Sequence, residues 1–280
     1  MDTRVTTKAP PPRTRRGGPS WRHTARTVGY PVVSLAVFIG AWALWVWLFK
    51  PGELVLPSPL AVWKSLVQWR DTLLPYTRTT LVETLLGFGL AAGAGLLLGM
   101  LLAFWAWARA GVYPLLVGSQ MVPKVALAPI FLIWFGVGLT SKVAIAFLTA
   151  FFPIVVSTTL GMRQVRPETI RLFRSMQAGR WQTFAKLRLP AALPSIFAGL
   201  KVAMTLAVVG AVVGEFIGAD TGLGYFMLYE SGQLDTPAVF AGLVVVTVMG
   251  VVLYFAVELV ERLVSPRTRP TPDGFNGATA

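Results

Sequence analysis

Long stretches without a charged residue constrain this chain more than any other feature of its sequence. They cover residues 27–49, 84–108, 143–162 and 236–257, while residues 110–141 and 189–214 contain one lysine each. Each stretch reaches the ~20 residues that a helix needs to cross the hydrocarbon core of a bilayer. A segment in lipid must satisfy its own backbone hydrogen bonds, and a helix does so. We therefore predict an all-α integral membrane protein with about six transmembrane helices.

The composition agrees and excludes several functional classes. Hydrophobic residues make up 55% of the chain and charged residues 13%, whereas a soluble domain carries about 25% charged residues. The absence of cysteine excludes disulfide scaffolds and thiolate metal sites. The single histidine, His23, argues against histidine-based metal sites and catalytic triads. We predict no metal site and no catalytic residue.

The distribution of lysine and arginine predicts the orientation in the membrane. Residues 1–29 hold seven of them and residues 163–188 another seven, and eighteen fall on one side of the predicted spans against five on the other. Short cytoplasmic segments carry the excess of basic residues. Both termini and residues 163–190 are therefore predicted to be cytoplasmic, at a bacterial inner or plasma membrane. Because topology accounts for the net charge of +13, we expect no nucleic-acid partner.

Three regions follow from these patterns. Residues 1–29 are basic and rich in proline, and we predict a disordered cytoplasmic tail that lies against anionic lipid. Residues 30–265 form the six-helix transmembrane domain, and residues 266–280 form a cytoplasmic C-terminal tail.

Two charged residues inside the apolar stretches are candidates for a functional role. Lys124 and Glu215 each carry a charge that costs about 2.5–3.5 kcal/mol at the centre of a bilayer. Lys124 near an interface can extend its amine to water, whereas Glu215 shares its predicted helix with only one other charge, Lys201. We interpret Lys124 and Glu215 as part of a translocation path or of an intramembrane ion pair.

Prolines and glycines predict where the helices bend and touch. Pro114, Pro123 and Pro129 fall in the third apolar stretch, where each removes a backbone donor, so a bent or broken helix that lines a cavity is expected. The pairs Gly89/Gly93 and Gly95/Gly99 in the second stretch have the spacing that lets membrane helices approach closely.

Residues 163–190 are too long for a simple turn. Pro167 and Glu168 suit a helix start, and Ala178-Gly179 weakens the middle of the helical pattern, so we predict two short helices that meet at a bend. We expect Leu189-Pro190 to close this segment before the fifth span. A helical stripe follows its length: Ile170, Phe173, Gln177, Trp181, Phe184 and Leu187. The stripe fits either an amphipathic helix resting on anionic lipid or an element that docks into a groove of a soluble partner.

Four motifs resemble one family of transport proteins. The segment WQTFAKLRLPAALP, residues 181–194, is similar to the second half of the EAA loop, the signature of the membrane permeases of binding-protein-dependent ABC importers. The other segments are QMVPKVALAP at 120–129, WFGVG at 134–138 and GLGY at 222–225. As a set they resemble the nitrate/sulfonate/taurine branch of that family, over about residues 55–265.

The first half of the loop departs from the family pattern. Alignment on Leu189-Pro190 places the family's Glu-Ala-Ala at residues 171–173, which are Arg-Leu-Phe here. The family's glycine falls on Gln177, and Gly179 follows two positions later. By analogy the turn at residues 175–184 docks onto the ATPase. The expected docking residues of this coupling loop are Ser175, Gln177, Ala178, Gly179, Trp181 and Phe184.

The resemblance implies a type I importer architecture and a set of partners. Two copies of the permease, as a homodimer, would form one path through the membrane. Two ATPase subunits would bind ATP and Mg, and an extracytoplasmic binding protein would deliver the substrate. The chain itself would need no cofactor and would have no ATPase site, and a phosphate-cradling Gly-x-x-x-x-Gly-Lys-Ser/Thr sequence is absent from it.

The substrate stays open at this stage. The branch implies a small anion such as a sulfonate, taurine or nitrate, and related members imply the alternative of a riboflavin or thiamine-precursor type compound. An ATP-independent secondary transporter is an alternative from another class, although such proteins usually pair inverted repeats with intramembrane carboxylates. A membrane scaffold without transport activity leaves the stripe in residues 163–190 unexplained.

Overall fold

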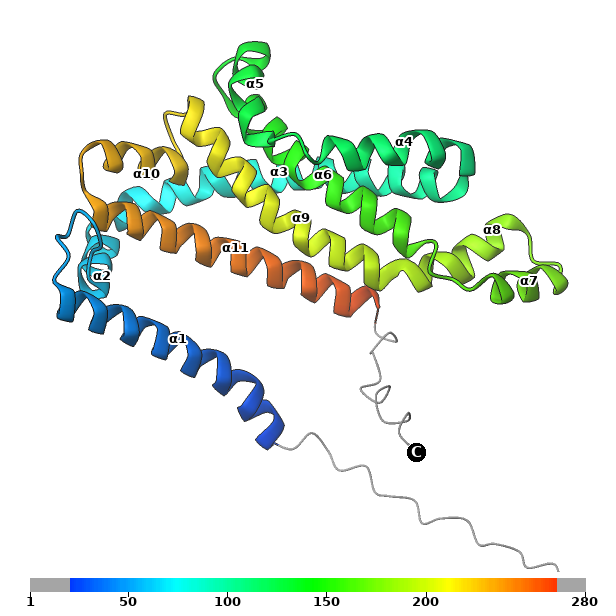
Figure 1. Cartoon of the computed structure of the whole chain (residues 1–280), viewed down its shortest axis with the longest axis horizontal. Helices are drawn as coiled ribbons and strands as arrows, with labels where there is room; N and C mark the ends of the chain where they lie inside the picture. The colour runs from blue at the N-terminus through cyan, green and yellow to red at the C-terminus, as the bar shows by residue number, and fades with distance from the viewer. Residues whose placement is uncertain (1–20, 266–280) are drawn as a thin grey trace, which may run out of the picture. The chain divides into compact units, whose positions relative to one another are not determined.

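The computed structural model describes residues 21–265 (Figure 1). The tails at residues 1–20 and 266–280 lie outside the described residues. Every regular element between residues 21 and 265 is helical, which confirms the predicted all-α class. The chain divides into two units, Met1–Pro51 and Gly52–Ala280, which are considered separately.

The described part of the first unit, residues 21–51, contains one long helix, α1 (Trp21–Phe49). Its segment Val32–Phe49 is apolar enough to span a membrane, as predicted. The helix begins at Trp21, so residues 21–29 are helical and do not belong to the predicted tail. The thickness of the hydrocarbon core sets the least length of a spanning helix, and the helix is free to continue beyond it.

The second unit is organised around α6 (Leu139–Gly161), which packs along α3 (Arg70–Phe104) on one side and α9 (Leu189–Gly218) on the other. The helix α11 (Thr236–Val264) contacts α9 and α3. Among residues 21–265, five helices are long and apolar enough to cross a membrane, and a bent pair makes a sixth span if it is counted as one. This confirms the prediction of about six transmembrane helices.

The bent pair is the predicted third span. It joins α4 (Ala106–Ser119) to a 3-10 turn at Lys124–Leu127 and to α5 (Ala128–Phe135), and its two halves are inclined by 87°. Pro123 precedes the 3-10 turn and Pro129 lies in the first turn of α5, whereas Pro114 is accommodated inside α4. Two of the three prolines therefore mark the break, because each removes a backbone donor that an uninterrupted helix would use.

Glycines allow α3 to approach α6 closely. A Cβ atom at Gly87 or Gly99 would collide with Ala146 or Thr158 of α6, and one at Gly95 would crowd Ile154. The predicted Gly95/Gly99 pair therefore packs as expected. The predicted Gly89/Gly93 pair makes no close contact within the described residues, where both glycines face open space, and its packing against another chain stays a prediction. Sequence spacing identifies close pairs on a helix but not the face that a neighbour covers.

Four short helices lie in two pairs at opposite ends of the second unit (Figure 1). One end, which we call the loop end, holds α7 (Pro167–Ser175) and α8 (Arg180–Thr183). The other, the α10 end, holds α2 (Pro59–Gln68) and α10 (Leu223–Gly232). The buried side chains form clusters along the helices between the two ends. The long helices thus physically connect the two ends.

Candidate functional site

The coupling loop forms two short helices, as predicted. Pro167 occupies the first turn of α7, and Glu168 places a negative charge near the positive end of that helix. The second helix, α8, begins at Arg180. Four residues separate the end of α7 from the start of α8, so the predicted bend lies at residues 176–179.

The bend is a Schellman motif that ends α7. The N–H of Ala178 donates to the carbonyl of Phe173 and the N–H of Gln177 donates to that of Arg174, both at 3.0 Å. Gln177 lies in the left-handed region, with a φ of 59°. This position of the motif usually holds glycine, because a Cβ atom is strained there. We expected Gly179 to provide the bend, but its φ of −65° suits any residue, so the conformational requirement falls on Gln177.

Side chains then hold the turn in place. The side-chain oxygen of Gln182 accepts from the N–H of Gly179 at 3.2 Å, and the Thr183 hydroxyl donates to the Gly179 carbonyl at 3.0 Å. At the end of α7 the Ser175 hydroxyl donates to the Leu172 carbonyl at 2.8 Å. The N–H of Gly179 at the start of α8 would otherwise lack a partner, whereas the carbonyls of Gly179 and Leu172 also accept from backbone N–H groups.

The loop does not close at Leu189-Pro190, contrary to the sequence expectation. A π-helical segment, η2 (Phe184–Arg188), joins α8 directly to α9, and the combined helix runs over Arg180–Gly218. Its widened hydrogen bond links the N–H of Leu189 to the carbonyl of Phe184. Pro190 lacks the donor for the next regular bond, and the wider turn absorbs this defect without ending the helix. The second short helix is therefore a continuation of the fifth span.

Among the predicted docking residues, Trp181 and Phe184 have opposite environments. Trp181 is 73% exposed, whereas Phe184 is 6% exposed. The ring of Phe184 lies 4.8 Å from that of Phe104 at the end of α3 and packs with Met162 and Ile196. Phe184 anchors the loop to the transmembrane helices and does not present its ring to a partner. Ser175, Gln177 and Gly179 are exposed, and Ala178 is partly buried.

Loop residues that sequence reasoning did not select complete the exposed apolar surface. Leu172 is 59% exposed and Met176 is 72% exposed. We call Leu172, Met176 and Trp181 the exposed loop patch. Apolar side chains on a short basic segment could have suggested it, although the sequence alone does not distinguish them from the buried Phe184.

Deep between the long helices lies a second cluster of polar groups. The Nζ atom of Lys142 donates to Oε1 of Glu83 at 2.9 Å, and the two side chains are 6% and 1% exposed. Glu215 is bonded to the same helix as Glu83, because Thr80 of α3 donates to its carboxylate. The predicted site residue Glu215 is therefore one of three buried ionisable groups that belong to α3, α6 and α9.

Glu215 holds the start of α10. One carboxylate oxygen accepts from the hydroxyl of Thr80 at 2.7 Å, and the other accepts from the N–H of Gly224 at 2.5 Å. Thr80 in turn accepts from the N–H of Leu223 at 2.9 Å. The first N–H groups of a helix lack partners within the helix, so α3 and α9 supply them here. Gly222 is required at this contact, since a Cβ atom there would overlap the Glu215 carboxylate.

Lys124 lies apart from this cluster. Its Nζ atom stands 4.8 Å from the centroid of the Phe152 ring, which is the geometry of a cation–π contact. Lys201, the other lysine in the apolar stretches, pairs with Glu261 at 2.6 Å. The structure thus does not bring Lys124 and Glu215 together as an ion pair. A role of either residue in a translocation path stays a prediction.

An aromatic pocket opens at the α10 end. It has a volume of about 350 Å³ and is lined mainly by Trp69, Tyr76, Tyr225 and Tyr229, with the Glu230 side chain beside them. The rings of Tyr76 and Tyr225 meet edge to face at 6.2 Å between centroids. Tyr225 belongs to the GLGY motif at residues 222–225. Stacking and edge contacts with a flat ligand are the interactions that such walls offer.

These features can be compared with known proteins. The family described as "Binding-protein-dependent transport system inner membrane component" matches residues 95–270. The chain belongs to this family. The match contains the coupling loop, the bent pair and the carboxylate of Glu215, and the resemblance to the family expected from the motifs is confirmed. The chain is accordingly a multi-pass inner membrane protein of the ABC permease type.

Individual relatives cover most of the permease. The formylaminopyrimidine transport permease protein ThiX of Halalkalibacterium halodurans is 38% identical, over 76% of this chain and 85% of its own length. The riboflavin transport system permease protein RibX of Chloroflexus aurantiacus is 37% identical, over 84% of this chain and 88% of its own. The taurine transport system permease protein TauC of Escherichia coli is 30% identical, over 88% of this chain and 92% of its own.

A solved structure supports the fold. One chain of the MetNI methionine ABC transporter, in an inward facing conformation, superposes on the permease with a TM-score of 0.61. The two chains are 21% identical, and the match covers 70% of this chain and 98% of the other. The predicted type I importer fold is confirmed by this likeness together with the family match.

Proposed function

We propose that this permease forms the translocation path of an ATP-driven importer and transmits the work of a separate ATPase subunit into the membrane. The ATPase subunits bind ATP and Mg, an extracytoplasmic binding protein delivers the substrate, and the permease has no ATPase site of its own. Its membership of the permease family supports this arrangement.

The continuity of α8, η2 and α9 is the observation that carries the proposal. Because the helix runs unbroken over Arg180–Gly218, a displacement of the coupling loop is passed directly to a membrane-spanning helix. Phe184 ties the same helix to the end of α3. ATP binding shifts the conformational equilibrium only if the ATPase contacts differ between the two states, and the loop is where those contacts reach the span.

The exposed loop patch is the surface on which the ATPase subunit docks. Leu172, Met176 and Trp181 offer apolar area, and the arginines around them suit an acidic groove rim. A buried tryptophan frequently dominates the energy of a protein interface. Docking at this patch also makes the loop end cytoplasmic, together with both chain termini, in agreement with the distribution of basic residues.

A second copy of the permease completes the path. The bent pair exposes large apolar side chains near its break, among them Met121 at 79%, Ile133 at 81% and Trp134 at 69%. Apolar exposure alone suits lipid as well as protein, but Leu132 of α5 packs at Gly218, where α9 ends before α10, and a path would open to the binding protein on that side. A homodimer places two such surfaces around one axis.

Two classes of substrate are considered, a small anion and a flat nitrogen heterocycle. We propose that the substrate is a heterocycle of the pyrimidine or flavin type. The relatives ThiX and RibX are named for formylaminopyrimidine and riboflavin, and they are more similar to this chain than the taurine permease TauC. The aromatic pocket offers ring walls and carries the carboxylate of Glu230. A carboxylate repels an anionic substrate, whereas aromatic walls stabilise a flat ring.

Capture of the cognate ATPase subunit tests the docking proposal. In Trp181→Ala we expect the amount of co-purified ATPase to fall by about tenfold, because a large buried contact is lost. Trp63→Ala is the matched control, since Trp63 is 64% exposed on α2 at the opposite end. Equal capture by both variants would refute docking at the loop patch. Uptake that continues without any ATPase would instead indicate a secondary transporter.

The substrate is tested with the cognate binding protein. Calorimetric titration with formylaminopyrimidine, riboflavin and taurine should give tight binding for one of the two heterocycles. Uptake of that compound into proteoliposomes should then decrease in Tyr225→Ala. Tight binding of taurine alone would overturn the heterocycle and support the anion, and the importer assignment would stand.

A further inference from the structure

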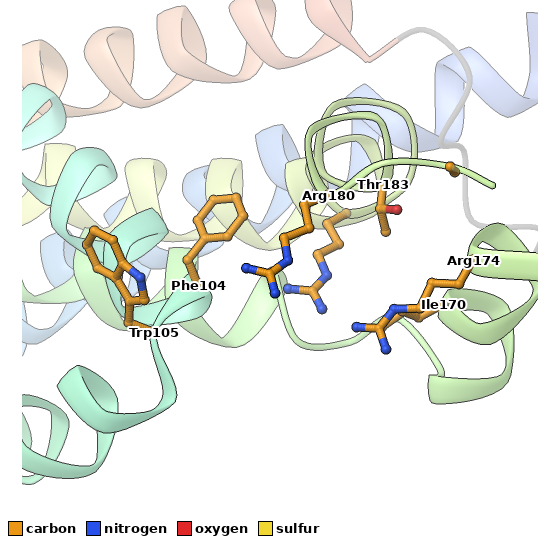
Figure 2. Close-up of a pocket in the computed structure, with 8 residues that line it drawn as sticks. Phe104, Trp105, Ile170, Arg174, Arg180 and Thr183 are labelled. Carbon is orange, nitrogen blue, oxygen red and sulfur yellow. The ribbon is translucent and has the colours of Figure 1, made fainter.

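A cationic cavity lies between the coupling loop and the end of α3 (Figure 2). Its volume is about 320 Å³, and Arg174, Arg180 and Arg188 line it together with Phe104 and Trp105. The side chains of Arg174 and Arg180 extend from the two short helices into the same space, which Phe104 and Trp105 border on the other side. The residues of the exposed loop patch do not line this cavity, so it is separate from the proposed docking surface.

The positive charge in the cavity has no counter-charge in the described chain. None of the three arginines pairs with a carboxylate of residues 21–265, and no acidic residue lines the cavity. The Nε atom of Arg188 is buried and has no hydrogen-bond partner within that range. A buried donor without a partner is costly, and three like charges around one space repel each other. An anion with several oxygen atoms would remove both penalties.

The chemistry of arginine fits an oxyanion. A guanidinium group is planar and offers a fork of N–H donors that matches two oxygens of one phosphate. Three such groups around a single cavity can donate to both free oxygens of a phosphodiester. A carboxylate also has two oxygens, so the position of the cavity, and not the number of acceptor oxygens, distinguishes the two anions.

The position of the cavity selects a lipid as the source of the phosphate. Phe104 ends α3 and Trp105 follows it, and both are half-exposed, at 45% and 50%. Leu101, one turn earlier on the same membrane-spanning helix, is 41% exposed. Tryptophan side chains gather where hydrocarbon meets headgroups. A lipid could therefore place its phosphate among the arginines and its acyl chains along the end of α3.

We propose that this cavity binds the headgroup phosphate of an anionic phospholipid, which joins the coupling loop to the end of α3. Basic pockets between transmembrane helices recognise such headgroups in the cytoplasmic leaflet. The bound lipid would neutralise Arg174, Arg180 and Arg188 and hold the two short helices at a fixed distance from the membrane. This inference does not depend on the ATPase partner or on the substrate.

Retention of lipid by the purified full-length chain tests the proposal. The chain in neutral detergent is incubated with equal amounts of phosphatidylglycerol and phosphatidylcholine, passed over gel filtration, and its bound lipids are counted by mass spectrometry. We expect the wild type to retain phosphatidylglycerol preferentially. In the triple variant Arg174→Gln, Arg180→Gln, Arg188→Gln this retention should fall by about tenfold or more, because three charge-assisted contacts are removed.

A second triple variant controls for charge. The triple variant Arg163→Gln, Arg171→Gln, Lys186→Gln also removes three positive charges from the loop, but none of these residues lines the cavity. It should retain phosphatidylglycerol like the wild type. Equal losses in both triple variants would show general attraction to a basic loop and overturn the proposal.

Two further arms separate the other sources of an anion. An excess of inorganic phosphate should leave lipid retention unchanged, and displacement of the lipid would indicate a site for a soluble anion. Loss of ATPase capture in the cavity variant with normal lipid retention would assign the arginines to an acidic residue of the partner. If the glutamine variant does not fold, Arg188→Lys is used instead. It keeps the charge but loses the fork of donors, and unchanged lipid retention in it would refute the site.

Discussion

The Nζ atom of Lys142 lies 2.9 Å from Oε1 of Glu83, and this ion pair joins α6 to α3 where both side chains are almost completely buried. The pair is surrounded by helices that pack closely through glycine, so neither group can turn to water. A buried charge that loses its partner is far more costly than the intact pair is stabilising. The pair therefore specifies how α3 and α6 align.

Replacement of Lys142 by methionine tests this directly. The variant leaves the Glu83 carboxylate buried beside an apolar side chain, and we expect a loss of about 3–5 kcal/mol in the free energy of unfolding. The double variant Lys142→Met, Glu83→Leu removes both charges and should recover much of that loss. Thermal unfolding in detergent measures all three proteins. A single variant as stable as the wild type would show that the pair contributes nothing.

The pair also shows why the sequence predicted the spans but not their contacts. The spans can be predicted from stretches without charge, because a charged residue at almost any position of a membrane-spanning segment is energetically costly. Lys142 lies just before such a stretch and is one of the five basic residues on the less basic side of the predicted spans, where a lysine is expected to face water. Its partner is 59 positions away in the sequence. The spacing of residues within one helix does not indicate which residue of another helix they contact.

The coupling loop was predicted more fully than the intramembrane cluster. The helical stripe predicted the helices, and Pro167 and Ala178-Gly179 predicted where one starts and where the two meet, since helix ends are marked by local sequence. The sequence could not show that Phe184 is buried and Trp181 exposed, because both lie on the same helical stripe. Phe184 is buried because its ring packs against Phe104 of α3, and the sequence does not indicate that contact. Nor could it show that a π-helical turn carries the helix past Pro190. Those outcomes depend on tertiary packing.

Glu215 should be measurably responsible for the order of α10. In Glu215→Ala the N–H of Gly224 loses its acceptor and the hydroxyl of Thr80 keeps only the carbonyl of Tyr76. We expect the free energy of local opening to decrease by about 1–3 kcal/mol. Glu215→Gln keeps one acceptor oxygen and should lie between the wild type and the alanine variant. Hydrogen–deuterium exchange of residues 219–235 provides the measurement. Unchanged exchange in both variants would exclude Glu215 as the cap of α10.

Gln177 should be replaceable by glycine with a gain in stability. Its φ of 59° strains a residue with a Cβ atom, and glycine removes about 1 kcal/mol of that strain. We expect Gln177→Gly to protect the loop from proteolysis and Gln177→Val to expose it further, since a β-branched residue tolerates this region least. Limited proteolysis of the two variants under the same conditions compares them. Cleavage that is faster in the glycine variant would contradict the assignment of the Schellman motif.

The close approach of α3 to α6 predicts opposite effects for two glycines on α3. A Cβ atom at Gly99 would lie 2.6 Å from that of Thr158, so Gly99→Ala should cost about 1–3 kcal/mol through overpacking. A Cβ atom at Gly93 would have no neighbouring atom within 4 Å, so Gly93→Ala should be neutral or stabilise the helix by up to about 1 kcal/mol. Thermal midpoints in detergent measure both. A destabilised Gly93→Ala would place that glycine against another chain.

Glu230 at the α10 end predicts a dependence of stability on pH. Burial, and then the nearby charge of Asp235, raise the pKa of Glu230 above its ordinary value of 4.5. The folded protein therefore holds this proton more tightly than the unfolded chain, and its stability decreases as the pH rises from 4.5 toward the raised pKa.

In Glu230→Gln that decrease is absent, so the variant should have a higher thermal midpoint than the wild type at about pH 8 and a similar one at about pH 4. Glu53→Gln serves as the control, because Glu53 is exposed and its replacement should leave the difference between the two pH values unchanged. A wild-type midpoint that rises with pH over this range, and falls in Glu230→Gln, would show that the carboxylate stabilises the α10 end in its charged form.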